Sequence, residues 1–134
     1  MPAKDLDELI AWLKANPDKA SAGNSSTNTR LLFAVLQKGT GTRFTLVPYR
    51  GGPPAVQDLA AGQIDMLFVA PVMLPLVRAG SIKAYAVTSE TRLALAPDIP
   101  TFAEMGLPAL SYPAWYGFFA PRGTPKDIIE IALR

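Results

Sequence analysis

The chain has no histidine and no cysteine among its 134 residues. Without histidine it lacks the one side chain whose unperturbed pKa lies near neutral pH. Without cysteine it has no thiolate nucleophile, no disulfide and no thiolate metal ligand. General acid–base catalysis would fall to Asp, Glu, Lys or Tyr, and each would need a large pKa shift. These absences favour a protein that binds over one that catalyses.

Charged residues and long apolar runs are also scarce. Charged side chains make up 18% of the chain and the net charge of +2 is dispersed, so no basic stripe indicates nucleic-acid binding. The apolar run at residues 66–77 is broken by prolines and is shorter than the roughly 18 residues of a membrane-spanning helix. The N-terminus lacks the hydrophobic stretch that a signal peptide needs. With 49% apolar residues, the chain is expected to fold as a single globular domain.

The first half of the chain alternates predicted helices and strands. Asp5 is a candidate N-cap with Glu8 as its capping-box partner, and apolar residues at helical spacing follow. Repeated strand–helix–strand steps predict an α/β fold with a mostly parallel sheet flanked by helices. The predicted strands are 19–23, 44–48 and 65–69, and the predicted helices are 30–38, 53–61 and 72–78.

Beyond residue 80, prolines divide the chain into short segments. The pattern predicts a strand at 83–88, a short helix at 102–105, an aromatic strand at 115–120 and a final helix from Thr124. That last helix stops abruptly at Arg134, which leads us to expect that part of the structure is built from further chain.

Residues 47–65 hold the most informative pattern. They read as a strand end, a glycine turn, a helix with proline in its first turn and the entry to another strand. Gly51 and Gly52 would let a ligand come close to the backbone, because no side chain blocks the approach. The helix after them is expected to point its free N–H groups at the same spot. The segment therefore predicts a ligand-facing loop without a catalytic residue.

Five motifs in order give the chain a family likeness. They are VPYRGG at 47–52, DLAAGQID at 58–65, AGSIKAYAVTS at 79–89, PDIPTFAEMG at 97–106, and WYGFFAP with a following GTP at 115–125. Together they resemble the Bug family, the extracytoplasmic solute receptors of tripartite tricarboxylate transporters. The likeness runs over nearly the whole chain.

This resemblance implies a type 2 periplasmic-binding-protein architecture, in which two α/β lobes close on a ligand. Residues 1–134 would form a single lobe, the second of the two, with the partner lobe built from sequence outside this chain. The family's ligands are small carboxylates, which the receptor delivers to membrane transporter subunits without chemistry. The resemblance thus implies a periplasmic protein that is not an enzyme and needs no cofactor and no metal.

The first candidate ligand-binding group is the loop at residues 23–29, which the resemblance places against the ligand's carboxylate. Ser25, Ser26 and Thr27 are the candidates, since hydroxyls and free N–H groups at a helix N-terminus attract an anion. The alternative is that residues 25–29 merely cap the helix, as such residues do widely. The two roles are compatible, and the resemblance favours ligand contact.

The second candidate group consists of Tyr49, Gly51 and Gly52. The Tyr49 hydroxyl would donate to a carboxylate or to a bridging water. The alternative is a core tyrosine at a strand end, with the glycines serving only the turn. Arg50 alternates away from Tyr49 and is expected at the surface.

The chain departs from the family pattern in two loops. Relatives usually have more glycine in the first loop and a histidine at or next to Arg30, which is expected here as a surface residue. Many also have a polar or acidic residue, and one more residue, where this chain has residues 69–71. Trp115 and Tyr116 are expected in the core of the lobe, with a cleft wall as the alternative.

Two other functions stay open from the sequence. A small enzyme with a carboxylate or lysine base would use Asp58 or Asp65, but one lies on a predicted helix face and the other at a strand entrance. No nucleophile elbow or phosphate loop supports that reading. A folded remnant that binds nothing is the other, and the apolar face where a second lobe would dock would allow it to self-associate.

Overall fold

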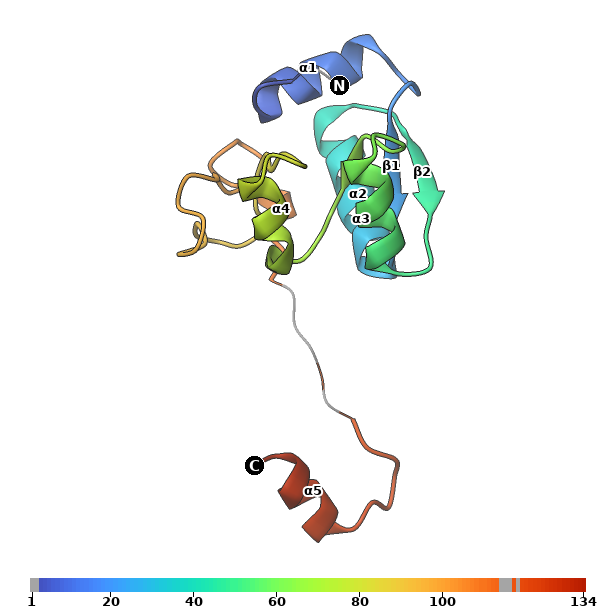
Figure 1. Ribbon diagram of the computed structural model, residues 1–134, viewed down its shortest axis with the longest axis vertical. Coiled ribbons are helices and arrows are strands. Elements are labelled where there is room, and N and C mark those ends of the chain that lie inside the picture. The colour runs from blue at the N-terminus through green and yellow to red at the C-terminus, as the bar shows by residue number, and fades with distance from the viewer. Residues whose placement is uncertain (1–2, 114–116, 118) are drawn as a thin grey trace.

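The computed structural model describes residues 3–113, 117 and 119–134. Its centre is a parallel sheet with the strand order β2-β1-β3 (Figure 1). The strands are β1 (Ser21–Asn24), β2 (Thr45–Pro48) and β3 (Met66–Leu67). The predicted α/β class with a parallel sheet is confirmed.

Helices connect and cover these strands. The larger ones are α1 (Leu6–Ala15), α2 (Thr27–Thr40) and α3 (Gly52–Ala60). Shorter ones follow: the 3₁₀ turn η1 (Pro71–Met73), α4 (Leu74–Arg78), the 3₁₀ turn η2 (Pro108–Leu110) and α5 (Lys126–Ala132). None of the helices in the described part of the chain is long and apolar enough to span a bilayer.

The start of α1 follows the predicted cap with one change. Asp5 accepts a hydrogen bond from the Glu8 N–H at 2.9 Å, as a capping residue does. The Glu8 carboxylate accepts from the Lys4 N–H at 2.9 Å instead of from Asp5. The apolar face of α1 is buried at Leu6, Leu9 and Leu13.

The core lies where α1 and α2 cover the sheet. Phe33 on α2 is 2% exposed and its ring contacts two others, Phe44 at 5.5 Å and Phe68 at 4.7 Å between centroids. Phe68 in turn contacts Phe102 at 5.9 Å. This chain of rings joins the parallel sheet to the segment beyond residue 80.

Two predicted elements of that segment are wrong. Residues 83–88 do not form a strand. Residues 83–86 have no backbone partner among the described residues, and Val87 makes only an isolated parallel bridge with Thr101. The helix predicted at 102–105 is a single turn, closed by reciprocal bonds between Thr101 and Glu104. Gly106, at φ +80°, turns the chain away after it.

The final helix is present as predicted, and α5 begins directly after Pro125. All residues of α5 are exposed, and Figure 1 shows it apart from the other helices. Of the predicted strand at 115–120, residues 115, 116 and 118 lie outside the described residues, so Trp115 and Tyr116 are not described.

Candidate functional site

The carboxyl ends of the three strands meet at one edge of the sheet. Because the strands are parallel, the loops that follow β1, β2 and β3 emerge side by side, at the end of the sheet opposite α1 (Figure 1). A backbone bond of 2.8 Å from the Tyr49 N–H to the Asn24 carbonyl ties the first loop to the second. Both candidate groups predicted from the sequence therefore lie at this edge.

The first loop ends in a capping box. Ser26 is the N-cap of α2, and its Oγ accepts from the Thr29 N–H at 3.2 Å. The buried Thr29 hydroxyl accepts from the Ser26 N–H at 3.0 Å and from the Ser25 N–H at 3.2 Å. Thr29 was not among the predicted site residues, although its position three residues after a serine is the capping-box spacing. The helix begins at Thr27, three residues earlier than the predicted Arg30.

Several donors at the start of α2 stay available after capping. The N–H groups of Thr27 and Asn28 donate to no described residue, and the hydroxyls of Ser25 and Thr27 bond to none. Ser25 is half-buried, while Thr27 and Asn28 are exposed. No acidic residue lies in the first turn, so the partial positive charge of the helix end is uncompensated. This end of α2 is chemically suited to hold an anion.

Arg30, in the same turn of α2, is exposed, as the sequence predicted. Arg50, in the second loop, is exposed as well. The charge of each guanidinium is therefore carried in solvent near the site, where salt screens it.

The Tyr49 side chain is engaged within the lobe. Its hydroxyl donates to Asp58 Oδ2 at 2.6 Å, and this hydrogen bond raises the pKa of Tyr49 above its ordinary value. The phenol therefore stays protonated with its proton committed to Asp58. For Tyr49 to donate to a bound carboxylate, this bond would have to open.

The two glycines of the second loop have different conformations. Gly51 is the N-cap of α3, with φ 101° and ψ 176°. Residues other than glycine rarely adopt this backbone conformation. Gly52 is the first residue of α3. The next two residues, Pro53 and Pro54, have no N–H, so α3 offers fewer donors than the expected cluster of free N–H groups.

The third loop presents apolar side chains only. Val69 is 40% exposed and is followed by exposed Ala70 and Pro71. No side chain in this loop can make a hydrogen bond, so its contribution to a ligand site is apolar contact.

The two aspartates weighed as bases have structural partners. Asp65 Oδ2 accepts from the Ser21 N–H at 2.9 Å and from its hydroxyl at 3.2 Å, at the entrance to β1. Asp58 accepts from Tyr49. The described residues contain no group of acidic, histidine or cysteine side chains able to hold a metal ion. The edge of the sheet thus carries neutral donors and apolar surface, which suits binding.

Comparisons of the sequence and of the structure with known proteins agree on one family. The profile of the tripartite tricarboxylate transporter family receptor matches residues 1–132. A protein of Agrobacterium vitis, described as a UPF0065 protein in the TAR-I ttuE-ttuC' intergenic region, is 36% identical over 130 residues. That match covers 95% of this chain but 38% of the relative, so the chain spans about two fifths of that protein's length.

Solved structures resemble the fold over nearly the whole chain. A structure described as a periplasmic transporter has a TM-score of 0.91 and 41% identity, and the match covers 97% of this chain and 44% of that one. Rpa4515 of R. palustris with adipate has a TM-score of 0.88 and 32% identity, covering 98% and 45%. MatC from Rhodopseudomonas palustris with bound malate has a TM-score of 0.83 and 32% identity, covering 96% and 45%.

Proposed function

The chain belongs to the family of tripartite tricarboxylate transporter receptors, and we propose that it is one lobe of a periplasmic receptor that captures a small carboxylate. The observation that carries this proposal is the N-terminus of α2. There the N–H groups of Thr27 and Asn28 and the hydroxyls of Ser25 and Thr27 remain available beside an uncompensated helix end.

The number of these donors suits the acceptor positions of a carboxylate, and the partial positive charge of the helix end suits its negative charge. A carboxylate is acceptor-only and can take several hydrogen bonds on its two oxygens. Hydrogen bonds to a charged group contribute about 1.5–3 kcal/mol each, and a helix end adds about 0.3–1 kcal/mol when exposed. Ser25 and Thr27 would donate to the carboxylate, and Ser26 would fix the loop that presents them.

The second loop contributes shape more than charge in this proposal. The backbone at Gly52 is open to an approaching ligand, since an added Cβ there would meet no atom within 4 Å. Tyr49 fixes the end of β2 through its hydrogen bond to Asp58. The apolar side chains of the third loop, Val69 to Pro71, would contact the carbon chain of the ligand.

A dicarboxylate is the ligand class that the relatives support. Adipate and malate, the ligands named with two of the similar structures, both carry two carboxylates on a short carbon chain. In this proposal the lobe holds one carboxylate of the ligand, at the start of α2. The second carboxylate would then be held by the partner lobe, with closure of the two lobes supplying most of the affinity.

Transfer to membrane transporter subunits and the absence of chemistry belong to the same proposal. The chain has no histidine or cysteine, and the two aspartates weighed as bases, Asp58 and Asp65, accept hydrogen bonds from Tyr49 and Ser21. A lobe of this kind would release its ligand unchanged.

A titration followed by amide NMR tests the proposal. The ¹⁵N-labelled chain is titrated with adipate and, separately, with adipamide, the uncharged diamide of the same length. We expect saturable shifts at residues 25–28 with adipate at millimolar concentrations, where the binding free energy is only about −4 kcal/mol. Adipamide is expected to give none.

Sodium chloride at matched ionic strength is the control for general salt effects. Equal responses to adipate and adipamide, or adipate shifts confined to other parts of the chain, would remove the basis for a carboxylate site at α2.

A further inference from the structure

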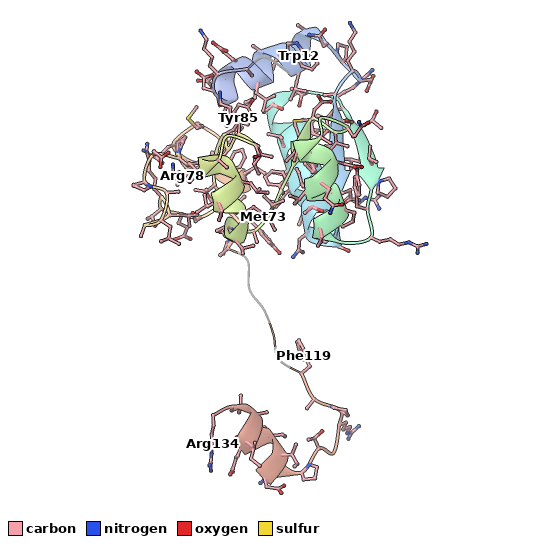
Figure 2. The ribbon with its side chains drawn as sticks, in the orientation of Figure 1. Trp12, Met73, Arg78, Tyr85, Phe119 and Arg134 are labelled. Carbon is pink, nitrogen blue, oxygen red and sulfur yellow. The ribbon has the colours of Figure 1, made fainter. Side chains whose placement is uncertain are left out.

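The chain reverses its direction of winding between β1 and β3. It leaves β1 through α2 towards β2 on one side, and it leaves β3 through η1 and α4 on the other side (Figure 1). In open α/β sheets, ligands bind outside the carboxyl ends of the two strands where the winding reverses. Figure 2 shows Met73, the last residue of η1, at the end of the lobe away from Trp12 on α1. The first and third loops therefore flank the position where such a sheet binds a ligand.

The register of the two strands places Ser25 and Val69 level with each other. Gly23 pairs with Leu67 in the parallel ladder, and Ser25 and Val69 each follow two residues later. The residue after each of them still has an extended backbone. Because neighbouring strands lie about 4.8 Å apart, a group bound at Ser25 comes within reach of the Val69 side chain.

Ser25 and Val69 also share a face of the sheet. A Cβ built on Gly23 would lie 2.9 Å from Leu67 Cδ1, so these two positions are on one face, whereas the Phe68 ring packs against α2 on the other. Side chains alternate between the faces along a strand. Two residues further on, this alternation returns both side chains to the face of Leu67.

The two loops differ in chemistry. The first loop carries the available hydroxyls of Ser25 and Thr27 beside the free N–H groups of α2. In and around the third loop, every side chain from residue 66 to residue 77 is apolar, and Val69 is 40% exposed. Arg50 follows β2, which lies on the far side of β1 from β3. Because backbone groups lie in the plane of a sheet and side chains stand on its faces, a ligand group against Val69 meets methyl groups.

We propose that Val69 makes the lobe select carboxylates that carry no hydroxyl on the carbon next to the bound carboxylate. This inference rests on the proposed function, since it needs a carboxylate held at the start of α2. With its carboxylate at Ser25, a ligand lays the adjacent carbon against Val69. A hydroxyl on that carbon loses its bonds to water and gains none from Val69, whereas a methyl group there buries apolar surface.

Two ligands of nearly equal shape test this selection. The ¹⁵N-labelled chain is titrated with 2-methylbutanoate and with 2-hydroxybutanoate, each as single enantiomers, and shifts at residues 25–28 report binding. Each acid has one carboxylate, so its substituent is always next to the bound group. A closed apolar pocket rejects an added hydroxyl by about a hundredfold, and for a single apolar wall we expect a ratio of about fivefold or more. This ratio is expected for the configuration whose substituent faces Val69.

Replacing Val69 by Thr supplies the missing hydrogen-bonding partner without a change of shape. In Val69→Thr the ratio is expected to fall to about twofold or less, while both acids still shift residues 25–28. Val72→Thr is the matched control, because it makes the same change three residues further along the chain, at a side chain that is 72% exposed. The control is expected to keep the ratio of the wild type.

The outcomes separate this inference from the proposed function. Equal affinities for the two acids in both configurations, with saturable shifts at residues 25–28, would overturn the role of Val69 and leave the carboxylate site in place. If neither acid shifts these residues, the carboxylate site fails and the selection fails with it. If Val69→Thr does not fold, the ratio in the wild-type chain decides the question.

Discussion

The Tyr49 hydroxyl donates to Asp58 Oδ2 at 2.6 Å and thereby joins the end of β2 to the second turn of α3. The Tyr49 ring also covers β1, since a Cβ built on Gly23 would lie 3.5 Å from Tyr49 Cε2. Tyr49 is thus a fixed part of the lobe. Its position holds the start of the loop that contains Gly51.

Replacing Tyr49 by Phe separates a structural role from a ligand contact. We expect Tyr49→Phe to lower the thermal midpoint, because the Asp58 carboxylate loses its donor. Adipate affinity, measured by NMR titration, is expected to change less than twofold. Tyr112→Phe is the control, because the Tyr112 hydroxyl makes no hydrogen bond with a described residue. A large loss of affinity without a loss of stability would assign Tyr49 to the ligand instead.

Thr29 is expected to be the main stabilising residue of the first loop. Thr29→Val keeps the shape but leaves the Ser25 and Ser26 N–H groups without their acceptor, and we expect a loss of about 1–3 kcal/mol in the free energy of unfolding. Thr29→Ser, which keeps the hydroxyl, is expected to recover most of it. Urea unfolding measures both, with exposed Thr27→Val as the neighbouring control. Equal stability of Thr29→Val and wild type would contradict the capping box.

The two glycines of the second loop are expected to respond differently to alanine. Gly51→Ala should cost about 1–3 kcal/mol of stability, because its φ of 101° is unfavourable for a side chain. Gly52→Ala should be neutral or slightly stabilising, since it is helical and its Cβ meets nothing within 4 Å. If ligand lies against this backbone, Gly52→Ala weakens adipate binding while leaving stability intact. Unchanged affinity would show that the loop does not contact the ligand.

Stability is expected to fall in acid because of two surface ion pairs. Hydrogen bonds from Arg78 lower the pKa of Asp98 to about 2, and hydrogen bonds from Arg92 lower the pKa of Glu104 to about 2. The folded state therefore binds fewer protons than the unfolded state in this range, so stability present above the ordinary values of 3.8 and 4.5 is lost as the pH falls towards 2.

Thermal unfolding between about pH 5 and pH 2 measures this effect. The decrease in midpoint is expected to be shallower in Glu104→Gln than in wild type, with Glu90→Gln as the control. Both pairs are exposed, so added salt should reduce the difference. The same slope in Glu104→Gln and wild type would refute the contribution of the Arg92 pair.

The sequence predicted the parallel sheet and its order of elements because apolar periodicity and caps are local signals. Which residue caps the start of α2 was harder to predict from the sequence. A run of Asn, Ser and Thr offers several equivalent caps, and the burial of Thr29 beneath the loop selects Ser26. The Tyr49–Asp58 bond depends on how β2 and α3 meet across a glycine turn, which spacing alone does not determine.

The segment 83–88 shows a different limit. Its apolar pattern is that of a strand, yet a strand is defined by its neighbours, and among the described residues the segment makes only an isolated β-bridge, at Val87. Similarly, Pro53 and Pro54 lower the number of free N–H donors at the start of α3. Both prolines are visible in the sequence, but the prediction of donors there rested on the glycine motif alone.

The most direct test of the account is the dissociation constant for adipate in the double variant Ser25→Ala, Thr27→Ala, measured by NMR titration against wild type. Ser81→Ala, an exposed serine away from this loop, is the matched control. The account predicts that the double variant binds at least tenfold more weakly, since about 1.4 kcal/mol corresponds to a factor of ten and each hydroxyl bond to a carboxylate is expected to contribute at least that much. An unchanged dissociation constant in the double variant would contradict a carboxylate site at the start of α2.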